Sequence, residues 1–237
     1  MDLRFEERPS DSPFVENVWR SQGEREGSFI SMAEAQYGLV VTEYRGTKFL
    51  TVRGPSTSAA PAYIPQDTQF IGIQFKPGVS LSILPPARVM DRHDLSLPEA
   101  ASQSFWLHGS AWQYPDYENA DTFVNRLVHD GLLACDPIVE AVLQARPVDM
   151  SIRNVRRRFL RATGLTHGAI YQIDRARYAT ALLKQGVSVL DTAFQAGYSD
   201  QPHLTHSLKR YIGLTPAQIQ DRNRTERLSF LYKTASL

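Results

Sequence analysis

VSVLDTAFQAGYSDQPHLTHSLKRYIGLTP, residues 187–216, has the pattern of two short helices joined by a tight turn. Ser188 is placed to cap a helix that begins at Val189, because its hydroxyl can accept from an otherwise unpaired backbone N–H. The helix is expected to end near Ala196, since Gly197 tolerates the left-handed backbone that is common at helix ends. The stretch therefore predicts a helix that stops at a defined turn, followed by a second helix.

The second helix of this stretch has an apolar face and a basic face. Ser199 or Asp200 can cap it, and Pro202 falls in its first turn, where a missing N–H costs little. Its inner stripe consists of Gln201, Leu204, Leu208 and Tyr211. Its outer face carries Pro202, His203, His206, Lys209 and Arg210. This division suits a helix that enters the major groove of DNA, but an ordinary helical hairpin with a solvated cationic face explains it equally well.

A similar unit lies upstream in ARPVDMSIRNVRRRFLR, residues 145–161, and decides between these alternatives. Ser151 is the expected cap, and the inner stripe consists of Ile152, Val155, Phe159 and Ala162. The opposite face carries Arg153, Arg157 and Arg161, with Arg156 on its flank. Guanidinium groups on one face repel one another, so they do not help the helix to form. Their arrangement suits the binding of a polyanion instead. Two such units in tandem favour nucleic-acid binding.

A long helix is expected between the two units, from Thr166, which should cap it, to Gln185. Eighteen helical residues span about 27 Å. Two helices that read successive major grooves must stand about 34 Å apart. The long helix and the width of its flanking units can supply that distance, so one subunit is predicted to read a bipartite site.

A larger pattern of residues covers the last hundred or so positions. Its members are Ser151, Arg157, Phe159, Gly164, Arg175, Ala179, Leu182, Leu183, Ala193, Gly197, Tyr198, Asp200, Gln201, Leu204, Lys209, Gly213, Thr215 and Pro216. At these mutual spacings they resemble the DNA-binding domain of AraC/XylS-type transcription regulators. The resemblance implies helix-turn-helix units at about 137–164 and 188–213 and a structural role for Arg175.

The chain departs from the family pattern at a few positions. Asp149 stands where the first unit usually has Gly, and Asp tolerates turn geometry. His206 replaces a common arginine, which weakens the expectation of a guanine contact there. Leu208 replaces a common Phe and alters only core volume. The residues expected to contact DNA are Ser151, Arg153, Asn154, Arg156, Arg157, Gln201, His203, Thr205, His206, Lys209 and Arg210.

The first 115 or so residues have a different texture, with ten of the 14 prolines and short apolar runs. Strands are expected at 38–44, 48–52, 62–64, 70–75 and 79–84, and a flexible loop at 56–62. A helix should follow from about Asn119 to Gly131, and Asp136 should cap the next helix, Ile138–Ala145. The predicted fold class is α+β with two domains. Residues 1–135 form a small antiparallel β barrel or sandwich with a trailing helix, and residues 136–237 form an all-α double helix-turn-helix domain joined by a linker helix.

The segment from FKPG, residues 75–78, through Asp91–Leu97 also resembles a sensor-like domain found on some AraC-type regulators. That resemblance implies binding of a small-molecule effector, dimerisation, or both. Tyr63, Phe75, Trp106 and Trp112 are the aromatic candidates for a pocket, although aromatic residues of a small β domain more often lie in the core. An alternative is a ligand-independent DNA-binding regulator whose N-terminal half only mediates dimerisation or partner contacts. A more remote alternative is an enzyme with an accessory DNA-binding domain.

Charge and composition narrow the function classes. Residues 1–136 hold 11 Lys and Arg against 18 Asp and Glu, whereas residues 137–237 hold 15 against 7, so only the second half should attract phosphates. No apolar run approaches the ~20 residues that span a bilayer, and the charged N-terminus lacks a signal-peptide core. We therefore expect a cytoplasmic protein that binds double-stranded DNA, without a membrane contact, with homodimerisation and contact with RNA polymerase as further candidate interactions.

Catalytic and metal-binding patterns are weak. Cys135, the single cysteine, is expected to be a small buried hydrophobic residue. His93 lies in DRHD, residues 91–94, but the N-terminal half lacks a His-x-His pair and an H-E-x-x-H motif. A surface loop explains DRHD more simply than a metal site does. No enzyme activity, cofactor or metal is predicted.

Overall fold

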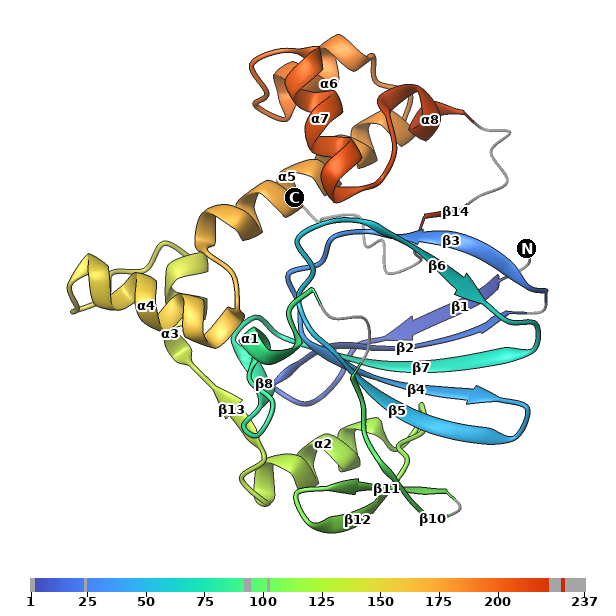
Figure 1. Cartoon of the computed structure of the whole chain (residues 1–237). Helices are drawn as coiled ribbons and strands as arrows, with labels where there is room; N and C mark the ends of the chain where they lie inside the picture. The colour runs from blue at the N-terminus through green and yellow to red at the C-terminus, as the bar shows by residue number, and fades with distance from the viewer. Residues whose placement is uncertain (1–2, 24, 92–94, 102, 222–226, 229–237) are drawn as a thin grey trace. The chain divides into compact units, whose positions relative to one another are not determined.

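The structure, a computed structural model, describes residues 3–23, 25–91, 95–101, 103–221 and 227–228. The chain divides into two compact units, whose elements are labelled in Figure 1. The first unit comprises Met1–Glu26, Ala35–Pro55 and Pro65–His167. The second unit comprises Gly27–Glu34, Ser56–Ile64 and Gly168–Leu237. Each unit therefore contains segments from the early and the late part of the sequence.

The first unit is built on an antiparallel sheet. In spatial order its strands are β1 (Leu3–Arg8), β2 (Val15–Gly23), β7 (Thr68–Phe75), β4 (Gly38–Tyr44), β5 (Thr47–Arg53) and β9 (Leu95–Ser96). In the β4–β5 hairpin Tyr44 pairs with Thr47, and Arg45 and Gly46 between them have φ of 51° and 78°. A two-residue loop with positive φ at both positions matches the twist of paired strands, so local sequence sets this register.

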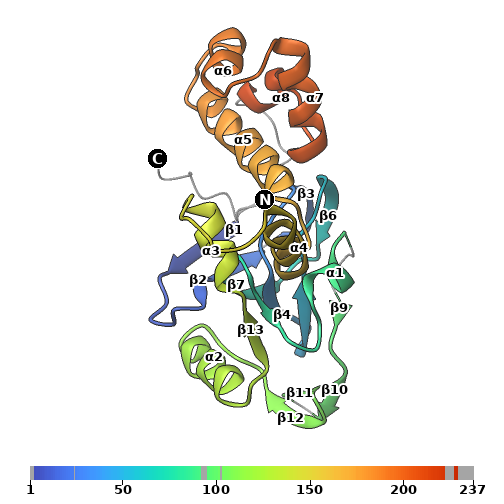
Figure 2. The same cartoon turned by 90° about the vertical axis from the view of Figure 1, so that its left-hand side faces the viewer.

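Shorter elements complete the first unit. They are β8 (Val79–Leu81) paired with β13 (Leu133–Cys135), the small sheet of β10 (Glu99–Ala101), β11 (Ser104–Leu107) and β12 (Ser110–Gln113), and the helices α1 (Pro86–Val89), α2 (Ala120–His129), α3 (Pro137–Leu143) and α4 (Ile152–Thr163). Figure 2 shows α2 and the β11–β12 hairpin on the same side of the main sheet. The core of this unit lies between the main sheet and these two elements.

That core joins the main sheet to α2 and the small sheet. Leu39 and Ile73 from the sheet, Leu127 from α2 and Phe105 from β11 are almost completely buried in one cluster. The Trp112 ring meets Phe123 of α2 edge-on, with ring centroids 5.8 Å apart. Burial of this apolar surface is the main favourable contribution to the stability of the unit.

The second unit consists of helices and a small three-stranded sheet. Its elements are β3 (Gly27–Ser31), β6 (Ala60–Ile64), β14 (Arg227–Leu228), α5 (His167–Lys184), α6 (Val189–Gln195), α7 (Gln201–Tyr211) and α8 (Pro216–Gln220). β3 pairs antiparallel with β6 and parallel with β14. The apolar cluster of this unit contains Leu183 of α5, Ala193 of α6, Leu204 and Leu208 of α7, and Met32, which follows β3. The second unit therefore has its own core.

The fold class predicted from the sequence is confirmed, with an antiparallel sheet in the first part of the chain and helices in the last part. Strands lie at the predicted runs around β4, β5, β6, β7 and β8, and α2 and α3 lie where helices were expected. Within the described residues, no helix is both long and apolar enough to cross a membrane. The domain boundary near residue 135 stays a prediction.

Some local predictions are wrong. Residues 56–62 do not form a free loop, because Ser56 bridges to Glu34 and Ala60–Ala62 belong to β6. The strand predicted at 79–84 ends at Leu81. Cys135 is exposed at the end of β13, because β13 pairs only with the short β8. Local composition does not reveal pairings with distant segments, which decide all of these positions.

Other predictions fall at the chain end. The sequence after Pro216 predicts a last short helix over Ala217–Arg224. The structure has α8 at this place, and α8 ends at Gln220. The tail is expected to be a solvated segment, but Arg227 and Leu228 form β14 against β3. Arg222, Arg224 and Lys233 lie outside the described residues. The same applies to His93 in the DRHD segment.

Candidate nucleic-acid interface

The first predicted helix-turn-helix unit is formed by α3 and α4 in the first compact unit. The Ser151 hydroxyl accepts a hydrogen bond from the backbone N–H of Asn154 at 3.4 Å, as the predicted cap requires. The helix stops at Gly164, whose φ of 74° lies in the left-handed region that favours glycine. Both ends of α4 are therefore set by local sequence.

Asp136 fixes α4 against the residues that precede it. Its carboxylate accepts from the backbone N–H of Ile138 at 3.1 Å and so caps α3, as predicted. The same carboxylate accepts two hydrogen bonds from Arg158 of α4, from Nε at 3.1 Å and from Nη2 at 2.7 Å. A bidentate arginine–carboxylate pair constrains orientation as well as distance. Sequence reasoning missed Arg158, because its partner lies 22 residues away.

The outer face of α4 carries the first of the two predicted groups of DNA contacts. Arg153, Arg156 and Arg157 are exposed, and Asn154 is partly exposed. Among the residues that the structure describes, none of these three arginines has an ion pair or a hydrogen bond. Ser151 is also exposed, although its hydroxyl is used in the cap. The row of unpaired cations faces solvent on a helix whose ends are fixed, which is suitable for binding phosphates.

The inner stripe of α4 is narrower than predicted. Phe159 and Thr163 are buried, and Val155 and Ala162 are partly buried. Ile152 is 71% exposed, which contradicts its predicted place in the stripe. It occupies the first helical position, where no other element covers it.

The second predicted unit, α6 and α7, belongs to the second compact unit. Ser188 caps α6 by accepting from the backbone N–H of Asp191 at 3.1 Å. Of the alternatives Ser199 and Asp200, Asp200 caps α7, accepting from the backbone N–H of His203 at 2.7 Å. That hydrogen bond, followed by the one from the Ser199 hydroxyl, holds the pKa of Asp200 below its usual range. The cap is therefore charged at neutral pH, next to the N-terminus of the helix, where a negative charge is favourable.

The outer face of α7 carries polar groups rather than a row of arginines. Gln201, His203, His206, Lys209 and Arg210 are exposed, and Thr205 is partly exposed. The exposure of Gln201 contradicts its predicted place in the inner stripe, which Leu204 and Leu208 do form. The His203 ring lies edge-on to Tyr198 with centroids 5.1 Å apart, and its Nδ1 lies 3.1 Å from the Ser199 hydroxyl. The imidazole of His203 is thus held in one orientation.

Arg175 of α5 supports the turn between α6 and α7. Its guanidinium donates to the carbonyl of Gly197 at 3.2 Å and lies over the Tyr198 ring at 4.1 Å. The Tyr198 hydroxyl lies 3.0 Å from that of Ser207 on α7, and burial raises the pKa of this phenol. These contacts agree with the structural role that the family resemblance implies for Arg175.

The end of α7 is held by segments from the early part of the chain. The backbone N–H of Ala33 donates to the carbonyl of Tyr211 at 2.7 Å, and that of Ala59 donates to the carbonyl of Arg210 at 2.8 Å. These bonds satisfy carbonyls that a helix C-terminus leaves without intrahelical partners. Nothing local in residues 27–34 or 56–64 signals this contact, so sequence reasoning missed it.

The outer faces of α4 and α7 lie in different compact units. Each face brings its own predicted residues together on one helix. The separation of the two helices by about one duplex turn therefore stays a prediction.

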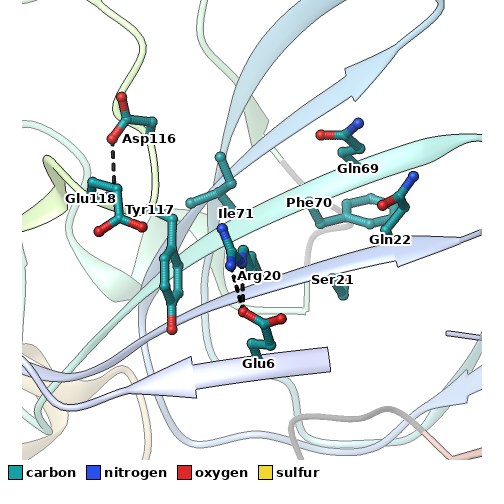
Figure 3. Close-up of a pocket in the computed structure, with 10 residues that line it drawn as sticks. All are labelled: Glu6, Arg20, Ser21, Gln22, Gln69, Phe70, Ile71, Asp116, Tyr117 and Glu118. Carbon is teal, nitrogen blue, oxygen red and sulfur yellow. Dashed lines mark hydrogen bonds and ion pairs between the residues drawn. The ribbon is translucent and has the colours of Figure 1, made fainter. Parts of the chain in front are cut away.

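The first unit also contains clefts of ligand size. One has a volume of about 380 Å³ and is shown in Figure 3. In it the Arg20 guanidinium donates twice to Glu6, at 2.8 and 2.6 Å, and lies 4.5 Å from the centroid of the Tyr117 ring. Asp116 and Glu118 contribute two further carboxylates to the lining. This cleft is therefore acidic, and its arginine is already paired.

A second cleft, of about 560 Å³, lies where α4 meets β8, β13 and the start of α1. Neither cleft is lined by Tyr63, Phe75, Trp106 or Trp112. Phe75 and Trp112 are core residues, whereas Tyr63 and Trp106 are exposed. The four aromatic residues therefore lie outside both of these clefts.

Comparison with family models places the predicted interface in a known class of domain. Residues 144–222 match the model of a helix-turn-helix domain, which includes the outer faces of both α4 and α7. Comparison with curated proteins gave no match. The match confirms the DNA-binding domain that the sequence resemblance implies.

Comparison with solved structures found ToxT from Vibrio cholerae. One ToxT structure is 10% identical, covers 91% of this chain and 97% of its own, and has a TM-score of 0.37. Another, ToxT from Vibrio cholerae O395 bound to (E)-4-(8-methylnaphthalen-1-yl)but-3-enoic acid, is 9% identical, covers 91% and 98%, and also has a TM-score of 0.37. At such TM-scores the likeness carries no argument about this chain.

Proposed function

We propose that this chain, which carries an AraC-type helix-turn-helix domain at residues 144–222, regulates transcription by sequence-specific binding to duplex DNA. The observation that carries the proposal is the row of exposed, unpaired arginines Arg153, Arg156 and Arg157 on α4. The mutual repulsion of these arginines does not stabilise the helix, and bound phosphates would relieve it.

On α4, arginine and asparagine supply complementary chemistry. An arginine fork can donate to O6 and N7 of guanine, and an Asn amide can pair with adenine. We therefore propose base and phosphate contacts by Arg153, Asn154, Arg156 and Arg157. Ser151 is proposed to fix the start of α4 near the DNA backbone. The positive end of the helix dipole there also favours a phosphate.

On α7, most of the proposed contacts are made by side chains that hydrogen-bond to base edges. Gln201, His203, Thr205 and His206 offer amide, imidazole and hydroxyl groups to base edges, and Lys209 and Arg210 offer charges to phosphates. The orientation of His203 by Ser199 and Tyr198 lowers the entropy cost of one such contact.

The test is selection of bound duplexes from random DNA at stated salt, followed by titration of variants on the selected site. Arg157→Ala should cost about 1–3 kcal/mol on that site and relax one base position. Arg146→Ala is the matched control, because Arg146 is exposed but paired with Glu140 at 3.3 Å. Failure to enrich any sequence would contradict sequence-specific binding, and an equal loss on all duplexes would make Arg157 a phosphate contact only.

The proposal includes a response to a small-molecule effector bound by the N-terminal part of the chain. The clefts of the first unit support it, because about 380 and 560 Å³ lie in the range of small-molecule sites. A ligand that binds only the folded chain raises its melting temperature, so thermal shift against a panel of metabolites separates a sensor from a ligand-independent regulator. A cytoplasmic location, homodimerisation and contact with RNA polymerase belong to the same proposal.

A further inference from the structure

The cleft of about 560 Å³ lies between α4, the proposed DNA-binding helix, and the strands β8 and β13 of the first unit. Its walls come from β8, β13, the start of α1 and one side of α4, all within the first compact unit. Gly164, at the end of α4, lies so close to α1 that a Cβ at this position would stand 3.1 Å from Pro86. The cleft is thus a structured junction between packed elements.

One positively charged side chain in this cleft has no ion-pair partner among the described residues. Asp136 and Arg158 both line it and neutralise each other through two hydrogen bonds. Arg161 also lines it, and among the described residues it has no ion pair and no hydrogen-bond partner. The net charge of the lining is therefore positive.

The remaining lining suits the body of a small organic molecule. Pro85, Ala134 and Ala162 offer apolar surface, and Ser80 and Ser82 offer hydroxyl groups. Apolar walls with a few polar groups at defined positions are typical of ligand sites. The cleft of Figure 3 lacks an unpaired cation, since Arg20 is held by Glu6 and further carboxylates surround it.

Arg161 also belongs to the outer row of α4. It follows Arg157 by four residues, and side chains at that spacing lie on the same helix face. Its guanidinium can therefore turn either to a DNA phosphate or to an anion in the cleft, but not to both at once. This shared position links the cleft to the DNA-binding face without a large conformational change.

We propose that this cleft binds a small organic anion, and that the anion competes with DNA for Arg161. The competition rests on the proposed DNA binding, whereas the ligand site does not. By linkage, the anion must weaken DNA binding by the same factor by which DNA weakens anion binding.

The first experiment measures ligand binding to the full chain without DNA. The probes are cyclohexanecarboxylate, cyclohexylamine and cyclohexanol, which share one apolar body and differ in charge. Calorimetry should detect binding of the carboxylate only, and Arg161→Gln should weaken it by about 10- to 100-fold, the range for a charge-assisted hydrogen bond. The control Arg146→Gln should leave it unchanged, because Arg146 lies outside the cleft lining.

The second experiment measures DNA binding as a function of salt, with and without saturating cyclohexanecarboxylate. Loss of one phosphate contact should lower the slope of log K against log salt by about 0.9. In Arg161→Gln the carboxylate should have no effect on that slope.

The results of these experiments test the ligand site and the proposed DNA binding separately. Equal binding of the carboxylate to Arg161→Gln and wild type, equal binding of the amine or the alcohol, or no binding of any probe would overturn the ligand site. Carboxylate binding at Arg161 without any DNA binding by the chain would support the site and contradict the proposed function. Carboxylate binding with an unchanged DNA salt slope would overturn the competition.

Discussion

The two proposed reading helices are held in different ways. α7 is anchored from within, because Leu204 and Leu208 are completely buried and its last carbonyls accept backbone hydrogen bonds from Ala33 and Ala59. α4 buries little of its length and depends on the surface ion pair of Arg158 with Asp136. The difference indicates that α7 is held rigidly by a core, whereas the position of α4, a charged helix, depends on a few polar contacts.

The largest expected effect tests the internal anchoring of α7. Leu208→Ala removes a completely buried side chain and should lower the free energy of unfolding by about 2–5 kcal/mol, because a cavity remains in the core. Urea unfolding followed by circular dichroism measures the change. Leu190→Ala is the control, since Leu190 is 64% exposed on α6 and its loss should change little. Equal costs for the two variants would contradict the anchoring.

The next effect tests how β3 docks on the end of α7. Gly213 and Gly186 have φ of 83° and 88°, so alanine is strained at both positions by roughly 1–2 kcal/mol. Only at Gly213 would the new Cβ meet another element, 2.7 Å from Cγ2 of Ile30 in β3, whereas Gly186 faces open space. Gly213→Ala should therefore lower the free energy of unfolding by about 1–3 kcal/mol more than Gly186→Ala, the usual cost of overpacking.

One result for these two variants would contradict the contact between β3 and Gly213. If chemical denaturation gives equal free energies of unfolding for Gly213→Ala and Gly186→Ala, β3 does not press on this position. The difference between α4 and α7 would then be smaller than the structure indicates.

The smallest effect concerns the ion pair that holds α4. Asp136→Ala removes both the cap of α3 and the partner of Arg158, and should cost about 1–2 kcal/mol. Asp136→Asn retains an acceptor for the cap and loses only the charge, so thermal unfolding should show a smaller shift. If the Asn variant is as unstable as the Ala variant, the ion pair, rather than the cap, supplies the stability.

Sequence reasoning located the helices well, because their ends depend on neighbouring residues. Ser151, Ser188 and Asp136 each accept a hydrogen bond from an N–H two or three residues further along the chain, and their types are sufficient to predict it. The outer faces of α4 and α7 followed from helical periodicity for the same reason. The main exceptions were Ile152 and Gln201, which occupy first helical positions that no other element covers.

The features that the sequence does not predict depend on contacts between residues that are distant in the chain. The pairing of Asp136 with Arg158, the docking of Ala33 and Ala59 on α7, and the strands β1 to β3 have no local signature. The cleft that contains Arg161 forms only when β8, β13, α1 and α4 meet. The sequence placed this arginine in the outer row of α4 but could not indicate that it also borders a cleft.

The central claim is that α4 and α7 read neighbouring major grooves of one duplex. Methylation protection of guanine N7 on the selected duplex tests it most directly, because N7 faces the major groove. With the wild-type chain we predict two protected clusters about 10 base pairs apart. Arg157→Ala should weaken one cluster and His206→Ala the other. A single cluster, or loss of the same cluster in both variants, would contradict the account.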